Sequence, residues 1–141
     1  MIQPLLSVMC TVTVHVSVPD EVPAPLPAEL HYDMTDPYAV RLSIGAPAAR
    51  PVDWVFARSL LTEGLHRPAG TGDVLVIPRD HCRPGSVRIV LRSAAGHALV
   101  DLAVSAVDAF LRRTVSLVPL GTESRHIDMD RALAELTDRQ D

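Results

Sequence analysis

The chain has 141 residues, of which 48% are hydrophobic, and its formal net charge is −4. This length and apolar content predict one folded domain with its own core and exclude an intrinsically disordered protein. The acidic balance and an aromatic content of only 4% argue against a broad nucleic-acid-binding surface.

The first apolar stretch, Leu5–Val18, is predicted to be a strand and not a targeting segment. No Lys or Arg precedes it and no small-residue cleavage site follows it. It is also too short to cross a bilayer as a helix. From Val12 onward valine alternates with polar residues, which is typical of a half-buried strand. Cys10 and Cys82 are too few for a disulfide framework, so we expect reduced thiols and a cytoplasmic protein.

Alternating apolar and polar residues predict strands along most of the remaining chain. Pro19–Pro27 holds four prolines and is predicted to be an extended connection. The predicted strands that follow it are Glu29–Tyr32, Ala39–Ile44, Pro51–Trp54, Val74–Ile77, Val87–Leu91 and Ala98–Val104. Ala95 and Gly96 are predicted to turn the chain between the last two.

A first helix is predicted over Ala57–Glu63, directly after the strand that contains Trp54. Its spacing directs Leu60 and Leu61 inward, and Gly64 is placed where a helix commonly ends. The glycine-rich residues that follow, Gly70–Asp73, precede a strand and lack the ending of a P-loop, so they indicate a tight turn and not a phosphate cradle.

Two further helices are predicted near the C-terminus. Ser105 with Asp108 resembles a capping pair, and an apolar stripe follows at Val107, Phe110 and Leu111. Arg112 and Arg113 are predicted to lie in the last turn of that helix, where its dipole favours cations. The final helix is predicted to begin at Asp128 and to bury Met129, Leu133 and Leu136.

Residue types found in active or metal sites occur in short motifs, and each motif has a simpler explanation. His126–Asp130 alternates possible metal ligands, but its two aspartates fit a helix start. Asp80–Cys82 places a thiol beside an imidazole, yet neighbours on an extended segment point apart. A hydrolase would require His31 or His81 to meet a carboxylate in a pocket. We therefore expect no enzyme, no catalytic residue, no bound metal and no cofactor.

Three segments, in this order and spacing, closely resemble the SsgA-like proteins, the sporulation and cell-division regulators of actinomycetes. They are Asp36–Ala39, Trp54–Pro78, and Phe110–Thr114 followed by Leu117–Glu123. All 13 basic residues are arginine, as the high-GC coding of actinomycetes produces.

The resemblance implies an α+β fold in a single domain: a mainly antiparallel, barrel-like sheet with two or three helices, similar to the whirly single-stranded nucleic-acid-binding proteins. Residues 1–27 are expected to form a strand and a proline-rich connection, and residues 28–141 the core that matches the family.

The resemblance also implies a non-enzymatic adaptor of sporulation-specific division. It is expected to be cytoplasmic and recruited to the septum, to form a homotrimer, and to contact FtsZ or another SsgA-like protein. No small-molecule substrate or membrane span is expected. The alternative is a single-stranded nucleic-acid-binding protein of whirly type. On this alternative a hairpin is expected to gather four arginines, Arg79, Arg83, Arg88 and Arg92.

Three residues of the Trp54–Pro78 run are predicted to contact a protein partner: Arg58, His66 and Arg67. All three are expected to be exposed, so that Arg58→Glu is predicted to leave the fold intact. Trp54 is expected in the core.

Overall fold

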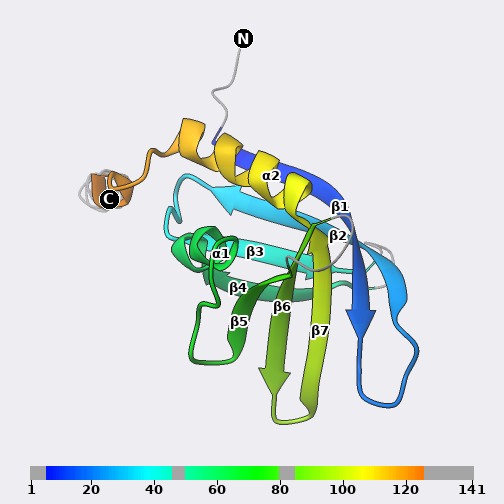
Figure 1. The fold of residues 1–141 in the computed structure, drawn as a ribbon. Helices are drawn as coiled ribbons and strands as arrows, with labels where there is room; N and C mark the ends of the chain where they lie inside the picture. Colours follow the sequence, from blue (N-terminus) through cyan, green and yellow to red (C-terminus); the bar gives the residue numbers. More distant parts are fainter. Residues whose placement is uncertain (1–5, 46–49, 80–84, 126–141) are drawn as a thin grey trace, which may run out of the picture.

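The computed structural model describes residues 6–45, 50–79 and 85–125. Its elements in chain order (Figure 1) are β1 (Ser7–Ser17), β2 (Ala24–Asp33), β3 (Ala39–Ile44), β4 (Val52–Ala57), α1 (Arg58–Gly64), β5 (Val74–Arg79), β6 (Ser86–Ser93), β7 (Gly96–Ala103) and α2 (Val104–Leu117). Residues 123–125 are also helical.

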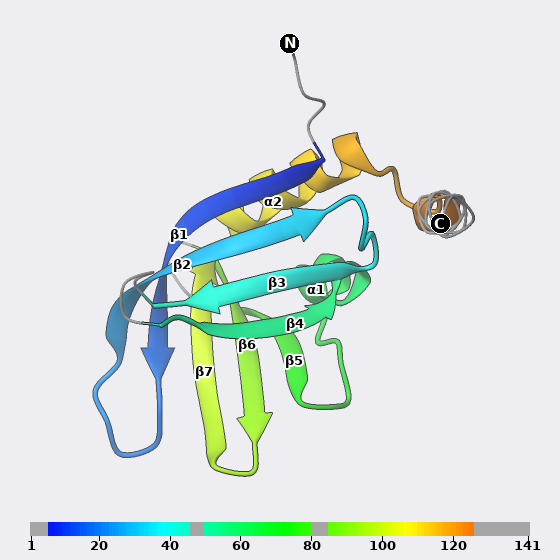
Figure 2. The ribbon, with the colours of Figure 1, turned by 180° about the vertical axis from the view of Figure 1, so that it is seen from behind.

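One seven-stranded antiparallel sheet contains all of these strands, in the order β4-β3-β2-β1-β7-β6-β5. β1 joins its two halves, because it pairs with β2 over most of its length and with β7 only from His15 to Ser17. Figure 2 shows β1 bending between β2 and β7, so that β2, β3 and β4 run across β5, β6 and β7 at a steep angle. The predicted α+β class and barrel-like antiparallel sheet are confirmed.

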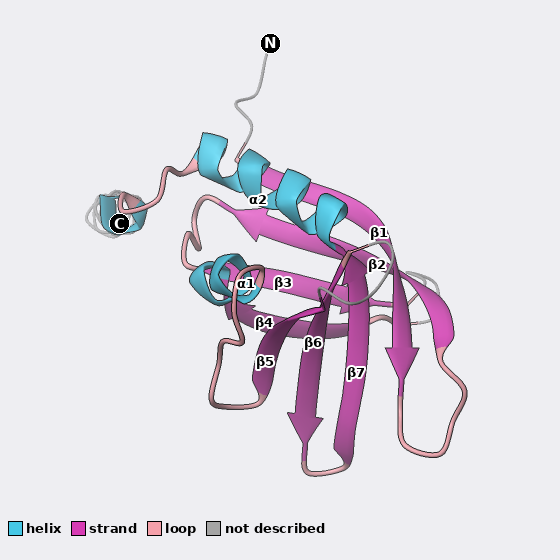
Figure 3. Ribbon diagram, in the orientation of Figure 1, coloured by secondary structure: helices cyan, strands magenta, loops and turns pink. Residues whose placement is uncertain are grey.

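The core lies on the concave side of this curled sheet. Alternate residues of both halves are fully buried there, among them Val14, Leu30, Leu42, Ile89 and Val100. α2 packs on β1 and β7, while α1 spans the gap between β4 and β5. Figure 3 shows both helices at the same end of the sheet, which leaves the other end open.

β2 begins earlier than predicted, because the proline-rich connection enters the sheet at Ala24. Pro25 and Pro27 pair with β1, whereas β3 pairs with β2 only from Ala28 to His31. Pro27 O accepts a hydrogen bond from Gly45 N at 2.8 Å, so the ring nitrogen of Pro27 faces away from β1. Proline is tolerated here because no ladder hydrogen bond to β1 is lost.

The two helices also differ in detail from the prediction. α2 has Ala103 as its N-cap with no side-chain cap, and it continues to Leu117, so Arg112 and Arg113 do not lie in its last turn. Gly64 is the last residue of α1 and not its left-handed cap. A Cβ at Gly64 would overlap the Val76 side chain, so this glycine permits close packing of α1 on β5.

The predicted helix from Asp128, the His126–Asp130 motif and the Asp80–Cys82 motif lie outside the described residues. None of the helices in the described part of the chain is long and apolar enough to cross a membrane.

Candidate protein-interaction surface

A groove between α1 and α2 contains one of the three predicted interaction residues. The groove has a volume of about 420 Å³. Leu111 forms part of its floor and is buried, whereas Leu120 lies at its edge and is 57% exposed. His66, just after α1, lines the same groove and is exposed. An apolar floor with a polar edge is the general composition of a protein-binding surface. We call this groove the α1–α2 groove.

Two ion pairs, one lining the α1–α2 groove and one beside it, form within single segments of the chain. Arg67 Nε lies 3.0 Å from Glu63 Oε1, and Arg112 Nε lies 3.0 Å from Asp108 Oδ2. Both pairs have the i,i+4 spacing of neighbours on a helix surface and are largely exposed. Such pairs contribute little to stability, so they are free to exchange partners. His66 and Arg67 are thus exposed, as predicted.

The expectation that Arg58 is exposed was wrong. Arg58 is the first residue of α1, and only 2% of its surface is exposed. Its backbone N donates to Tyr38 O at 2.7 Å, which directs α1 off the end of β4 and across the sheet. The long side chain therefore points under α2 and not into solvent. Arg58 is a structural residue, and the predicted tolerance of Arg58→Glu is overturned.

The guanidinium of Arg58 binds the end of α2 and the residues that follow it. Nη1 donates to Val118 O at 2.8 Å and to Thr114 O at 3.2 Å. Nη2 donates to Glu123 Oε1 at 2.6 Å. Val118 lies just beyond α2, where carbonyls have no partner within the helix, so Arg58 supplies its donor. Thr114 O also accepts the capping hydrogen bond from Val118 N, so Arg58 is its second donor. We call this set of contacts the Arg58 network.

Tyr32 completes the Arg58 network from the sheet side. The centre of the guanidinium lies 4.9 Å from the centroid of the Tyr32 ring, within the range of a cation–π contact. The Tyr32 hydroxyl donates to Pro37 O at 2.8 Å. The buried cation is therefore balanced by a carboxylate, two carbonyls and an aromatic face, which is how buried charge is tolerated.

The electrostatics of this network follow from burial and hydrogen bonding. Burial raises the pKa of Tyr32 to about 12, against the lowering effect of the Arg58 charge. The pKa of Glu123 is lowered from its ordinary value, first by a hydrogen bond from its own backbone N–H and then by Arg58, against the raising effect of desolvation. Gly121 N also donates to this carboxylate, at 3.1 Å from Oε2. Both shifts keep Tyr32 neutral and Glu123 charged around neutral pH.

Comparison with known proteins assigns the family. The sequence model for "Streptomyces sporulation and cell division protein, SsgA" matches residues 26–123. The chain belongs to the SsgA family. It is 46% identical over 130 residues to the sporulation-specific cell division protein SsgB of Streptomyces coelicolor. This alignment covers 92% of this chain and 95% of that protein. SsgB of Thermobifida fusca is 43% identical over 92% of this chain and 94% of its own length.

The fold agrees with this assignment. A crystal structure of an SsgA-like sporulation-specific cell division protein from Thermobifida fusca superimposes with a TM-score of 0.86 at 41% identity. The match covers 96% of this chain and 98% of that one.

The segments that carry the SsgA-family resemblance meet at the Arg58 network. Asp36–Ala39 supplies the carbonyls of Pro37 and Tyr38. The run from Trp54 supplies Arg58 itself, and the last segments supply Thr114, Val118 and Glu123. Sequence reasoning missed this convergence. One signal was available: Arg58 is the only charged residue between Asp53 and Glu63, inside an otherwise apolar run.

His31 does meet a carboxylate, as a hydrolase would require. Its Nε2 lies 3.1 Å from Glu29 Oε1, beside a hollow of about 330 Å³ that Ser7 and Arg41 also line. Among the described residues, no hydroxyl or thiol forms a hydrogen bond with His31. A nucleophile bonded to the histidine is the group that would define a catalytic dyad. Nor do the described residues hold three or more metal-ligating side chains close enough to bind an ion.

The arginines of the β5–β6 hairpin do not form the open positive surface that the nucleic-acid alternative requires. Arg79 and Arg88 both bind Asp101 of β7, at 2.7 Å and 2.8 Å. One carboxylate thus offsets part of the charge of two guanidinium groups. Arg92 is exposed, and Arg83 lies outside the described residues.

Two remaining expectations concern the run from Trp54 to Pro78. Trp54 is only partly buried, packs against the core and lines a cavity at the open end of the sheet. The Gly70–Asp73 segment is a turn, as predicted: Gly70 has a φ of 103°, which favours glycine, and the chain enters β5 directly afterwards.

Proposed function

We propose that this chain is a regulator of sporulation-specific cell division. The observation that carries the proposal is the extent of the family match. Relatives described as sporulation-specific cell division proteins align with this chain over nearly their whole length at 43–46% identity. The full set of elements around the Arg58 network is therefore within the aligned region, and the fold agrees. A cytoplasmic protein that is recruited to the division septum fits this role.

We further propose that the chain acts without catalysis, as an adaptor that uses the α1–α2 groove. The groove combines an exposed apolar residue, Leu120, with the exposed His66 at its edge, and the exposed Arg67 follows His66 in the sequence. The nearby ion pairs are weak enough to rearrange on binding. The proposed partners are the tubulin-like division protein FtsZ or another SsgA-like protein, and the proposed assembly is a homotrimer.

The role in division is tested by imaging. A fluorescent fusion in a sporulating host should form bands at division sites, and deletion of the gene should disturb septum formation. A diffuse fusion together with normal septa in the deletion strain would contradict the proposal.

The groove is tested with purified proteins. Leu120→Asp places an unpaired charge in the proposed contact, and we expect it to weaken capture of purified FtsZ or of a purified SsgA-like protein at least about tenfold. His66→Glu and Arg67→Glu should act in the same direction. Val22→Asp is the matched control, because Val22 is 85% exposed in the turn after β1, at the other end of the molecule. Equal capture by Leu120→Asp and Val22→Asp would exclude the groove.

The proposed homotrimer is tested separately by light scattering of the purified protein. A measured mass equal to that of one chain would contradict it.

A further inference from the structure

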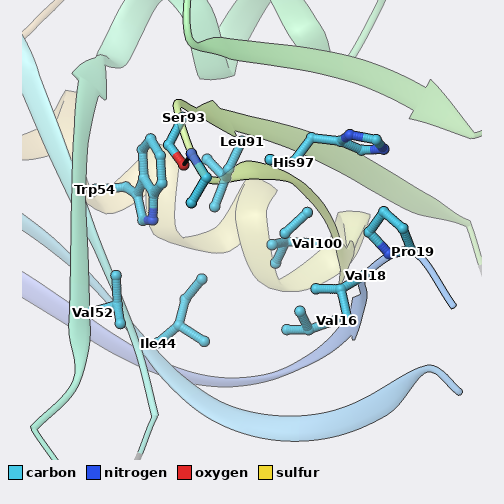
Figure 4. Close-up of a pocket in the computed structure, with 13 residues that line it drawn as sticks. Val16, Val18, Pro19, Ile44, Val52, Trp54, Leu91, Ser93, His97 and Val100 are labelled. Carbon is cyan, nitrogen blue, oxygen red and sulfur yellow. Dashed lines mark hydrogen bonds between the residues drawn. The ribbon is translucent and has the colours of Figure 1, made fainter. Parts of the chain in front are cut away.

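The open end of the curled sheet contains a cavity that the proposed function does not use. Its volume is about 540 Å³, within the usual range of ligand-binding sites. Figure 4 shows apolar side chains around this cavity from β1, β3, β4, β6 and β7. The principal ones are Val16, Ile44, Val52, Trp54, Leu91 and Val100. We call this cavity the sheet mouth.

The lining of the sheet mouth selects an uncharged occupant. No Asp, Glu, Lys or Arg is among its lining residues, and His97 is the one residue there that can ionise. A charged group placed in the mouth would lose hydration without gaining an opposite charge. Val52 is 59% exposed at the edge of the mouth, so apolar surface remains open to a partner.

One wall of the sheet mouth is the free edge of the sheet. β4 pairs with β3, and no other strand in the described parts of the chain pairs with it. Along an antiparallel strand, the backbone groups of successive residues point alternately toward and away from the neighbouring strand. Arg58 N bonds with Tyr38 O, so every second residue before Arg58 points toward β3. The backbone groups of Asp53 and Val55 therefore point away from β3. Unpaired backbone groups on an edge strand are a template for another strand.

β4 also lacks the residues that commonly protect such an edge. It contains no lysine and no proline, and its one charged residue is Asp53. Asp53 Oδ1 accepts a hydrogen bond from Ser43 Oγ at 2.6 Å, which holds the carboxylate against β3. The free edge is therefore open to backbone pairing.

We propose that β4 and the sheet mouth bind an extended peptide segment of a partner protein by strand addition. The segment pairs with the backbone of Asp53 and Val55, and its alternate apolar side chains enter the mouth beside Val52 and Trp54. The indole N–H of Trp54 makes no hydrogen bond within the described residues, so it is available to a carbonyl of the segment. Strand addition obtains affinity from main-chain hydrogen bonds and specificity from pockets for alternate side chains.

The same observations favour a different protein over a second copy of this chain. β4 and β5 are the two terminal strands in the order of the described sheet, so they are the strands that a second copy would offer along their whole length. β5 carries Pro78 and Arg79, and its outer edge already bonds with Ala69. β4 carries Asp53. The mouth requires a strand that carries no charge and has an unpaired backbone edge. Neither β4 nor β5 meets both requirements.

The test uses Trp54, which is the only tryptophan of the chain, as its reporter. The probe is a capped seven-residue peptide of alternating valine and threonine. The control probe has the same side chains but is N-methylated at alternate residues, so that it cannot pair along one edge. We expect saturable binding of the first peptide, with a blue shift of the Trp54 emission, and at least about tenfold weaker binding of the second.

Two variants on the same strand provide the matched control. Val52→Asp charges the mouth and should weaken peptide binding at least about tenfold. Val55 is 61% exposed, close to the 59% of Val52, but its side chain lies on the opposite face of β4. Val55→Asp should therefore bind the peptide within about twofold of the unchanged protein. Circular dichroism of both variants verifies the fold.

Each other outcome overturns the proposal. No saturable binding of the unmethylated peptide would exclude strand addition at this site. Equal binding of the methylated peptide would show that backbone pairing plays no part, and equal binding by Val52→Asp would exclude the mouth. If Val52→Asp alone lowers the mass of the peptide-free protein in sedimentation, a second copy occupies the mouth instead. None of these results depends on the α1–α2 groove, so the two proposals are tested separately.

Discussion

The guanidinium of Arg58 and the carboxylate of Glu123 lie 2.6 Å apart, although 65 residues separate them in the sequence. The arginine side chain is 2% exposed and the glutamate side chain 14%. This pair fixes the residues after α2 against the start of α1. Because the pair is largely buried, its loss is expected to affect the fold before it affects any contact at the surface.

Arg58→Met should destabilise the protein by about 3–5 kcal/mol, because it removes the cation that pairs with the Glu123 carboxylate and leaves the Val118 carbonyl without its donor. Urea denaturation measures the change. Arg67→Met is the control, because Arg67 forms an exposed arginine–glutamate pair. Its loss should change the free energy of unfolding by no more than about 0.5 kcal/mol. Equal effects of the two substitutions would refute the structural role of Arg58.

Stability at low pH should depend on Glu123. Its pKa in the folded protein is lower than the ordinary value of 4.5, so its contribution is present above about pH 4.5 and is lost as the pH falls through the lowered value. Glu123→Gln should therefore be less stable than the unchanged protein at pH 7, and the difference should shrink below pH 4.5. Urea titrations in this range measure it, with Glu63→Gln as the exposed control. A difference that stays constant with pH would contradict the linkage.

Stability at high pH should depend on Tyr32. Its pKa is raised from 10.0 to about 12, so its contribution is present below pH 10 and is lost as the pH rises toward 12. In Tyr38→Phe, Tyr32 is the only remaining tyrosine, and its ionisation can be followed by ultraviolet absorbance. We expect ionisation well above pH 10, accompanied by unfolding in the far-ultraviolet circular dichroism. Ionisation of Tyr32 with a midpoint near pH 10, in a protein that stays folded, would contradict the prediction.

Gly64→Ala should destabilise the protein by about 1–3 kcal/mol, because its methyl group would overlap the buried side chain of Val76. Gly72→Ala is the matched control: no atom lies within 4 Å of the position that its Cβ would take. Thermal unfolding of the two variants provides the comparison. A Gly64→Ala protein as stable as Gly72→Ala would mean that α1 is not in close contact with β5.

Single-stranded DNA should bind weakly, if at all, because Asp101 holds both Arg79 and Arg88. Anisotropy of a labelled oligo-thymidine, measured between about 50 and 200 mM salt, tests this expectation. Tight binding that falls steeply over this range would revive the nucleic-acid alternative. Asp101→Asn removes the negative charge that both arginines bind and should increase any binding that is seen.

Much of the sheet is predictable from local pattern alone. In β3, Val40 and Leu42 are buried and Arg41 is exposed, as alternation predicts, although Ser43 is buried as well. Phe110 and Leu111 are buried in α2 for the same reason, at helical spacing. Each of these elements buries one face, so its apolar residues recur in the sequence at a regular spacing that identifies the element.

The Arg58 network is not predictable in this way. Periodicity treats a charged residue in the first turn of a helix as solvent-facing, whereas the partners of Arg58 include Thr114, 56 residues later. Similarly, Gly64 was expected to end a helix, but the feature that requires glycine is Val76 on another element. In both cases the physical cause is a tertiary contact, which a local pattern does not contain.

β1 precedes the other described strands in the sequence, yet Ser17 at its end pairs with Leu99 of β7, the last of them. Early β1–β2 pairing can occur on the ribosome, but the bend in β1 has no second neighbour until β7 has emerged. Until then the half-sheet that contains β1 and β2 cannot cover its apolar face with β7. Such long-range pairing slows folding and exposes intermediates to aggregation. Production of this protein is therefore expected to respond strongly to chaperone supply and growth temperature.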